Sequence, residues 1–254
     1  MRALLIDTTK CIACGACVSA CREANKLPET ESTELNDKQF TVLKKLADKG
    51  GEVNYRRLCM HCLDPTCVSV CPVGALVKAS NGPVLYEEDR CIGCRYCIQA
   101  CPFSIPRYEW SNLNPKVRKC IFCAHRLEKG QQNACAEACP TGATTAGTRD
   151  ALFKEARARL AAEPAKYVQT IYGEKDGGGT SVLYLSSVPF EKLGLPLNLG
   201  VEPLPHLTFK VLSKIPPAVG VGSCALAGLW WLTKRKAEVA KAEVRQAETA
   251  EVRS

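Results

Sequence analysis

The chain has 254 residues, of which 46% are hydrophobic, and its 34 Lys and Arg against 26 Asp and Glu give a formal charge of +8. This apolar content excludes a disordered chain. The basic residues flank cysteine motifs and the C-terminal apolar stretch without forming a long basic run, so the charge does not indicate nucleic-acid binding. Seventeen cysteines in tight tandem spacings favour metal ligation over a disulfide scaffold, which is typical of short secreted chains.

The first predicted element is a strand at residues 3–6, a run of four apolar residues. This run is far shorter than the apolar region of a cleavable signal peptide, and no Arg-Arg pair precedes it, so we expect no export signal in these residues.

Sixteen cysteines then follow in four groups of four. Groups one and three have the spacing C-x2-C-x2-C-x3-C, group two has C-x2-C-x4-C-x3-C, and group four has C-x2-C-x11-C-x3-C. In order, the groups are Cys11, Cys14, Cys17 and Cys21; Cys59, Cys62, Cys67 and Cys71; Cys91, Cys94, Cys97 and Cys101; Cys120, Cys123, Cys135 and Cys139. Proline follows the last cysteine of groups two, three and four, whereas Arg22 follows that of group one.

This spacing fits the [4Fe–4S] cluster, in which each iron needs one thiolate. In the bacterial ferredoxin run the fourth cysteine ligates the other cluster of a pair. Glycines such as Gly15 and Gly93 let the backbone approach the inorganic sulfides. Zinc is the alternative, because two C-x2-C pairs often form a four-thiolate zinc site, but zinc does not require the x2-x2-x3 run. No cysteine of the four groups is replaced, so the sequence predicts four [4Fe–4S] clusters and no three-iron centre.

Short apolar runs flank the groups, at residues 74–77, 83–86 and 142–145, and predict a repeated order of strand, cluster loop, short helix and strand. The predicted fold is α+β, with duplicated bacterial ferredoxin-like units in residues 1–148. The polar residues 22–58 are interpreted as a surface insertion. Residues 149–163 suit an amphipathic helix, and 182–185 a strand, within an extension over 149–209. The glycine-rich residues 177–179 lack the Lys of a phosphate-binding loop and predict a turn.

Residues 215–233 contain no charge, and as a helix they would span roughly 28 Å, near the thickness of a hydrocarbon core. Trp230 and Trp231, followed by three basic residues, are typical of a membrane interface. The sequence thus predicts a transmembrane anchor within 210–233 and a charged tail at 234–254. Cys224 lies in a stripe of small residues with Gly220 and Gly228, which suits helix packing better than metal ligation.

The four groups, the 149–163 helix, the segment 172–180, Val188-Pro189-Phe190 and the single C-terminal span together resemble one family. It is the four-cluster iron–sulfur electron-transfer (beta) subunit of membrane-bound respiratory oxidoreductases, as in formate dehydrogenase and menaquinone-reducing hydrogenase. The resemblance implies that group one pairs with group four, and group two with group three. The implied ligand sets are Cys11, Cys14, Cys17 and Cys139 for cluster 1; Cys21, Cys120, Cys123 and Cys135 for cluster 2; Cys59, Cys62, Cys67 and Cys101 for cluster 3; Cys71, Cys91, Cys94 and Cys97 for cluster 4.

The expected function is that of a non-catalytic electron-transfer subunit. It would relay electrons between a catalytic subunit and a membrane subunit that holds haem b or a quinone site. Neither a nucleophile-and-base pair nor a nucleotide loop is evident in the sequence. His61 and His125 are candidates to hydrogen-bond a cluster sulfur, with a surface position as the alternative. A soluble polyferredoxin and a zinc-binding membrane protein are the competing interpretations.

Two further expectations concern the complex. Formate dehydrogenase and hydrogenase remain open as the type of complex: the segment 172–180 and the short insertion favour the hydrogenase type, but that subunit usually brings its own twin-arginine signal. The basic residues after Thr233 predict a cytoplasmic tail and a periplasmic cluster domain at the inner membrane. The resemblance implies that the subunit is exported together with a catalytic partner that bears the twin-arginine signal.

Overall fold

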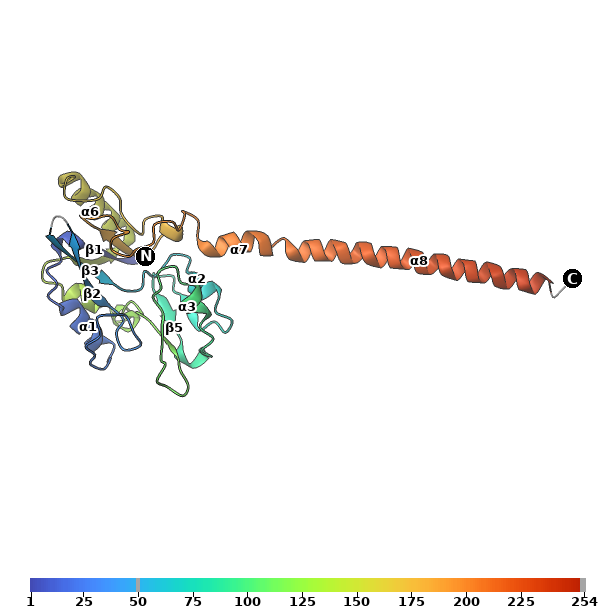
Figure 1. The fold of residues 1–254 in the computed structure, drawn as a ribbon, viewed down its shortest axis with the longest axis horizontal. Coiled ribbons are helices and arrows are strands. Elements are labelled where there is room, and N and C mark those ends of the chain that lie inside the picture. The colour runs from blue at the N-terminus through green and yellow to red at the C-terminus, as the bar shows by residue number, and fades with distance from the viewer. Residues whose placement is uncertain (49–50, 252–254) are drawn as a thin grey trace. The chain divides into compact units, whose positions relative to one another are not determined.

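The computed structural model describes residues 1–48 and 51–251, and the chain divides into two units, Met1–Pro205 and a second that begins at His206 (Figure 1). The strands are β1 (Arg2–Asp7), β2 (Val42–Asp48), β3 (Gly51–Arg57), β4 (Leu76–Lys78), β5 (Val84–Tyr86), β6 (Arg107–Tyr108), β7 (Val117–Arg118), β8 (Thr144–Thr148) and β9 (Val182–Leu185). The helices are α1 (Ala16–Ala24), α2 (Thr66–Ser69), α3 (Tyr96–Ala100), α4 (Ala124–Leu127), α5 (Ala134–Glu137), α6 (Arg149–Ala162), α7 (Leu204–Leu212) and α8 (Ile215–Glu251). Short 3₁₀ helices lie at Thr8–Lys10, Glu88–Arg90 and Asp176–Gly178.

A three-stranded sheet with the order β8-β1-β9 is the centre of the first unit. Strand β1 is buried from Ala3 to Asp7 and β9 along its whole length, so both are covered on both faces, whereas β8 is mostly half-buried. Helix α6 covers one face with Leu152, Phe153, Ala156 and Leu160, the apolar side predicted from the sequence. Thr148 caps this helix, accepting a hydrogen bond from the Ala151 N–H at 3.3 Å. Figure 1 shows α6 and α1 on opposite sides of β1.

Two antiparallel strand pairs are flanked by cysteine groups in the same way. In the antiparallel pair β1–β8, Ile6 lies opposite Thr144; Ile6 is five residues before Cys11, and Thr144 is five residues after Cys139. In the antiparallel pair β4–β5, Leu76 lies opposite Tyr86, and these residues are five after Cys71 and five before Cys91. Each ladder therefore brings the start of one cysteine group to the end of another, group one to group four and group three to group two.

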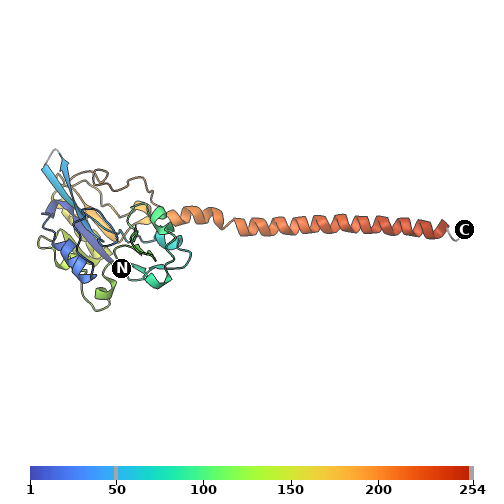
Figure 2. The same ribbon diagram turned by 60° about the horizontal axis from the view of Figure 1, so that its bottom comes forward.

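Residues 22–58 correct one sequence interpretation, because they are more than a surface insertion. Strands β2 and β3 form a long antiparallel ribbon, visible in Figure 2. Leu35, Phe40, Val42 and Leu58 are buried in the same core cluster as Cys21 and Cys59. Polar residues dominate this segment because one face of the ribbon is exposed, and the few apolar residues are those that face the core.

The core of the first unit contains the cysteines themselves. Cys21, Cys59, Cys120 and Cys135 belong to its largest buried cluster, among Leu, Phe, Tyr and Val side chains. Small two-stranded sheets supply little further apolar area. Ligand binding at these cysteines would therefore contribute directly to the stability of the fold.

The helical stretch Leu204–Glu243 comprises α7 and most of α8, and all but its first two residues belong to the second unit. It is long and apolar enough to cross a membrane, with a mean hydropathy of 1.4 in an apolar window of which no part is buried. Helix α8 continues to Glu251, so the predicted charged tail is helical as far as the structure describes it. Ala, Glu, Lys and Arg, which dominate the tail, are strong helix formers and explain this extension. The unit boundary at Pro205–His206 precedes the anchor start expected at residue 210.

Candidate metal centres

Each of the four cysteine groups begins with the same backbone turn. The residue two positions after the first cysteine has a positive φ in every group; these residues are Ala13 (55°), His61 (47°), Gly93 (70°) and Phe122 (60°). Gly15 (78°) and Arg95 (64°) repeat this conformation two residues later in groups one and three. Alternation between right- and left-handed conformations turns successive N–H groups toward one side and forms a concavity that binds anions, including iron–sulfur groups.

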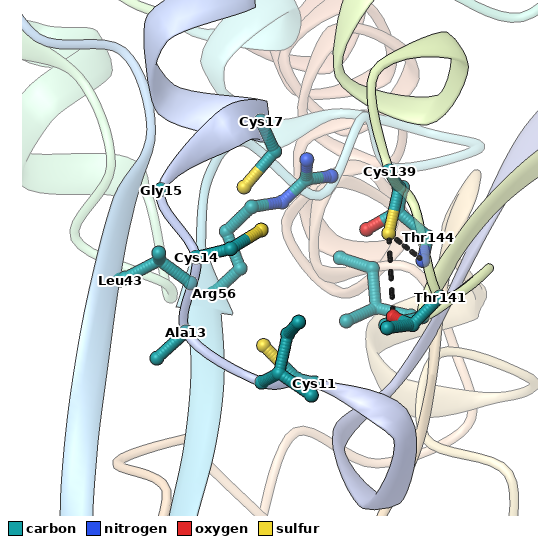
Figure 3. Close-up of a pocket in the computed structure, with 13 residues that line it drawn as sticks. Cys11, Ala13, Cys14, Gly15, Cys17, Leu43, Arg56, Cys139, Thr141 and Thr144 are labelled. Carbon is teal, nitrogen blue, oxygen red and sulfur yellow. Dashed lines mark hydrogen bonds between the residues drawn. The ribbon is translucent and has the colours of Figure 1, made fainter.

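A pocket with about 390 Å³ of empty space, including its open mouth, is lined by Cys11, Cys14, Cys17 and Cys139. Figure 3 shows the sulfur atoms of these four residues around it, three from the loop and start of α1 and one from the segment before β8. The Thr144 N–H donates to Cys139 Sγ at 3.4 Å. We refer to these four cysteines as quartet one.

A second pocket, with about 320 Å³ of empty space, repeats this arrangement at the other pair of groups. It is lined by Cys71, Cys91, Cys94 and Cys97, which we refer to as quartet four. The Ala75 N–H donates to Cys71 Sγ at 3.2 Å, much as Thr144 does in quartet one. Tyr86 lines the same pocket, and its hydroxyl lowers the pKa of the Cys91 thiol against the opposing effect of burial.

The remaining eight cysteines form two deeper sets. Quartet two consists of Cys21, Cys120, Cys123 and Cys135, all buried. Burial first, and then the neighbouring Cys135 and Cys123, raise the pKa of the Cys21 thiol to about 12. Quartet three consists of Cys59, Cys62, Cys67 and Cys101, with Cys59 buried and the others half-buried. Burial and the charges of its three quartet neighbours hold the pKa of Cys62 well above its usual value.

Four short segments each place two cysteines four residues apart, and each such pair contributes to two quartets. Helix α1 carries Cys17 of quartet one and Cys21 of quartet two, and Cys135 and Cys139 at α5 join the same two quartets. The pairs Cys67–Cys71 and Cys97–Cys101, at α2 and α3, join quartets three and four in the same way. Cys17 and Cys21 share one face of α1, since side chains at i and i+4 do so in a helix. Cys139, Cys71 and Cys101 lie one or two residues beyond the ends of their helices, still close to the first cysteine of their pair, so the joined quartets are spatial neighbours.

Quartets two and three are also neighbours, and this contact joins the two halves. Cys59 lies close enough to Cys120 to raise its pKa further, after the larger effects of burial and Cys21. His61 and Phe122, from the equivalent turns of groups two and four, pack edge to face with ring centroids 4.7 Å apart. The quartets therefore follow one another in the spatial order one, two, three, four.

The chemistry of the donor set fits iron–sulfur clusters. Gathering four thiolates in a buried space is unfavourable by itself, as the raised pKa values of Cys21 and Cys62 from burial and neighbouring charge show. Bound iron would supply the missing positive charge. Within residues 1–48 and 51–251, no three His, Cys, Asp or Glu side chains converge as the ligands of a single metal ion do. A cubane requires a different arrangement, since each thiolate bonds its own iron.

The two histidine candidates differ in their surroundings. His61 is fully buried, which excludes the surface position, and its Nδ1 accepts a hydrogen bond from the Val84 N–H at 3.0 Å. Burial, together with Lys119 and Lys78, holds its pKa well below the usual value, so the ring is neutral. His125 is half-buried on α4. Cys224 lies exposed in the second unit, apart from all four quartets in sequence.

Sequence reasoning missed two buried cations beside the quartets. Arg56 lines the pocket of quartet one, and Lys119 donates from Nζ to the carbonyls of Val84 and Cys120 at 2.6 and 3.0 Å. In the sequence, Arg56 and Lys119 were only two of the 34 Lys and Arg residues that give the net positive charge. The position of Lys119 directly before Cys120 was the one signal that could have identified it.

Comparisons with known proteins agree with this geometry. The 4Fe-4S dicluster domain family matches residues 10–75 and residues 53–149. The chain is 38% identical to a protein of Nitratidesulfovibrio vulgaris, over 96% of this chain and 70% of that protein. It is 37% identical to the Hydrogenase-2 operon protein HybA of Escherichia coli O157:H7, over 91% of this chain and 84% of HybA.

Formate dehydrogenase subunits are similar at the same level. The iron–sulfur subunit of formate dehydrogenase-O of Escherichia coli is 37% identical over 77% of this chain and 71% of that subunit. Three findings lead to the same family. Two dicluster domains match the chain, its relatives align over most of both chains, and its thiols gather in sets of four. The chain belongs to the family of 4Fe-4S electron-transfer subunits found in hydrogenase and formate dehydrogenase complexes.

Proposed function

We propose that this chain holds four [4Fe–4S] clusters, one in each cysteine quartet, and relays electrons along them between a catalytic subunit and a membrane subunit. When bound, such clusters supply a series of one-electron sites. The observation that carries the proposal is the continuity of the series: cysteine pairs four residues apart join quartet one to two and quartet three to four, and Cys59 and Cys120 bring quartets two and three together.

The two ends of the series are the parts open to partners. Cys14 of quartet one and Cys94 of quartet four are exposed, whereas quartets two and three contain no exposed cysteine. Ile12 and Ile92, the residues after the first cysteine of their groups, are 62% and 65% exposed. Exposed apolar side chains over an end site would exclude water when a partner covers them. The proposed route thus begins and ends at quartets one and four.

The role proposed for the chain is conduction without catalysis. Its residues hold the clusters, shield the middle ones and position their charges, while the oxidation of hydrogen or formate belongs to the catalytic partner. The names of the hydrogenase and formate dehydrogenase relatives support this type of partner. The apolar helix Leu204–Glu243 supports a partner within the membrane, which would carry haem b or a quinone site.

Iron analysis and spectroscopy test the number of clusters. Anaerobically purified chain should carry about 16 iron and 16 acid-labile sulfide, four for each quartet. A zinc protein would be colourless and free of sulfide. A value near 12 iron, with full occupancy of the purified chains established by mass spectrometry, would show that one quartet is not a cluster site.

The identity of the catalytic partner requires the intact complex. The chain solubilised from membranes with mild detergent should bring down a hydrogenase or a formate dehydrogenase catalytic subunit. Reduction of the clusters by hydrogen alone would assign the first type, and reduction by formate alone the second. A chain that remains in the supernatant after cell lysis would instead be a soluble polyferredoxin.

A further inference from the structure

The most unusual buried group in the first unit is the guanidinium of Arg56 on β3. Arg56 is 2% exposed and is the largest of the fully buried side chains. Its Nε, Nη1 and Nη2 form no hydrogen bond to an oxygen or nitrogen within the part of the chain that the structure describes. A buried cation without such partners is costly unless an opposite charge compensates it.

Sulfur atoms surround this cation instead. Arg56 lines the pocket of quartet one, and Figure 3 shows its side chain reaching from the strand toward the Cys17 sulfur. It also interacts with Cys135, which belongs to quartet two. Burial lowers the pKa of Arg56, whereas Cys135, Cys17 and Tyr184 raise it. A guanidinium keeps its charge in proteins. The guanidinium is therefore shared by two neighbouring quartets.

The backbone holds Arg56 at this place. Leu43 of β2 lies opposite Arg56 in the ribbon. The Arg56 carbonyl oxygen accepts a hydrogen bond from the Tyr184 hydroxyl at 2.6 Å. Arg57, the next residue, extends on the other face of β3, where its Nη2 donates to the Phe103 carbonyl at 3.1 Å. The two adjacent arginines thus have different partners: Arg56 lies against cysteine thiols, whereas Arg57 binds a backbone carbonyl.

We propose that Arg56 sets the reduction potentials of the clusters in quartets one and two, as a fixed cation that both share. This inference rests on the proposed binding of clusters by those quartets. An added electron makes a cluster more negative, and a nearby positive charge in a medium of low dielectric favours that state. Hydrogen bonds to cluster sulfurs act in the same direction. Arg56 is thus a positioning and tuning residue at the first junction of the series, and quartets three and four lie beyond its contacts.

The test is a redox titration followed by electron paramagnetic resonance on the full chain in its membrane complex. Four variants are compared with the wild type: Arg56→Met, Arg56→Gln, Arg56→Lys, and Arg57→Met as a control that removes the adjacent charge. Cys139→Ser and Cys123→Ser variants assign the signals of quartets one and two. In Arg56→Met the one-electron reduction equilibrium of both clusters should become at least tenfold less favourable, a fall of about 59 mV.

The controls separate charge from structure. Arg56→Lys should recover most of the shift, and Arg57→Met should leave the potentials of quartets one and two unchanged. Quartets three and four should be unaffected in the Arg56 variants. Unchanged potentials in Arg56→Met with about 16 iron, or an equal fall in Arg57→Met, would overturn the proposal. If both Arg56→Met and Arg56→Gln fail to retain that iron, the residue is structural and the proposal is also overturned. A wild-type chain with fewer iron atoms contradicts the proposed function instead.

Discussion

At the scale of single residues, the turns that begin the cysteine groups differ in the space around them. Gly93 has a φ of +70°, and a Cβ there would lie 2.9 Å from the Pro115 carbonyl oxygen and 3.1 Å from the Tyr108 hydroxyl. Gly15 has a φ of +78°, but a Cβ would meet nothing within 4 Å. Ala13, with a φ of 55°, already stands in group one at the position of Gly93 in group three. The left-handed backbone alone therefore tolerates a methyl group in this kind of turn.

We expect Gly93→Ala to destabilise quartet four and Gly15→Ala to have a smaller effect on quartet one. The left-handed conformation costs about 1–2 kcal/mol for a residue with a Cβ. At Gly93 overpacking adds about 1–3 kcal/mol, because the nearest contact is a backbone oxygen. Iron content and the temperature at which the brown colour is lost measure both variants. An equal loss in the two would mean that backbone strain, and not the contact with Pro115, is decisive.

Asp7 is a second residue whose surroundings predict a large effect. It is fully buried at the end of β1, accepts hydrogen bonds from the Thr9 N–H at 3.1 Å and the Tyr167 hydroxyl at 3.0 Å, and pairs with Arg159 at 2.8 Å. It thereby holds the 3₁₀ turn that leads into Cys11. Asp7→Asn should cost about 2 kcal/mol, because Arg159 and the Tyr167 hydroxyl lose a buried carboxylate as their hydrogen-bond acceptor, and hydrogen bonds to charged groups contribute about 1.5–3 kcal/mol.

The control for Asp7 uses the other carboxylate on the same arginine. Glu155 of α6 also pairs with Arg159, but its side chain is 42% exposed, whereas that of Asp7 is fully buried. Glu155→Gln should cost less than about 1 kcal/mol, as is usual for a surface pair. Anaerobic thermal unfolding of the two variants compares them, and similar melting temperatures would argue against a structural role for the buried pair.

At the scale of elements, the antiparallel ladders determine which cysteine groups meet. Register in β1–β8 places Thr144 opposite Ile6, and so brings Cys139 to the loop of Cys11. Cys139→Ala should therefore remove the signal of the cluster in quartet one and leave that of quartet four largely intact. Electron paramagnetic resonance of the reduced protein distinguishes the two. Cys224→Ala is the matched control and should leave the iron content unchanged, whereas prior loss of the quartet four signal in Cys139→Ala would show the pairing to be wrong.

Some elements of the fold could be predicted from the sequence and others could not. The cysteine spacing, the strands at residues 3–6 and 182–185, and the apolar side of α6 were predictable, because ligand chemistry and periodicity leave direct traces in the sequence. The contribution of residues 22–58 to the core was not, since their polar residues outnumber the four apolar residues that are buried there. Arg56 was hidden for the same reason: a charged residue in a polar segment is typical of the surface. Its burial depends on thiols distant in sequence, which only the fold brings together.

At the scale of the whole molecule, the two units differ in what covers their apolar residues. The first buries its apolar side chains around the cysteines, whereas α8 exposes Leu226, Trp230 and Trp231 along a helix with no buried residue in its most apolar window. A long exposed apolar helix is stable in lipid or against a membrane partner. Lys234 lies over the Trp230 ring at 5.1 Å, an arrangement suited to the interface between lipid and water.

The last prediction concerns the side of the membrane on which the cluster unit lies. Lys234, Arg235 and Lys236 directly follow the uncharged residues 215–233, and only Lys210 and Lys214 lie near their other end. Because orientation follows Lys and Arg close to the span, the tail is expected in the cytoplasm and the cluster unit in the periplasm. Protease added to intact spheroplasts should then digest the cluster unit and spare an epitope at the C-terminus.

Replacement of Lys234, Arg235 and Lys236 by Gln should leave the cluster unit protected in part of the population, because more basic residues then lie close to the start of the span than to its end. Gln at Lys241 and Arg245, which lie further from the span, should change the protection little. Full protection of the cluster unit in the wild type would place it in the cytoplasm, and its electron-donating partner would then have to lie there as well.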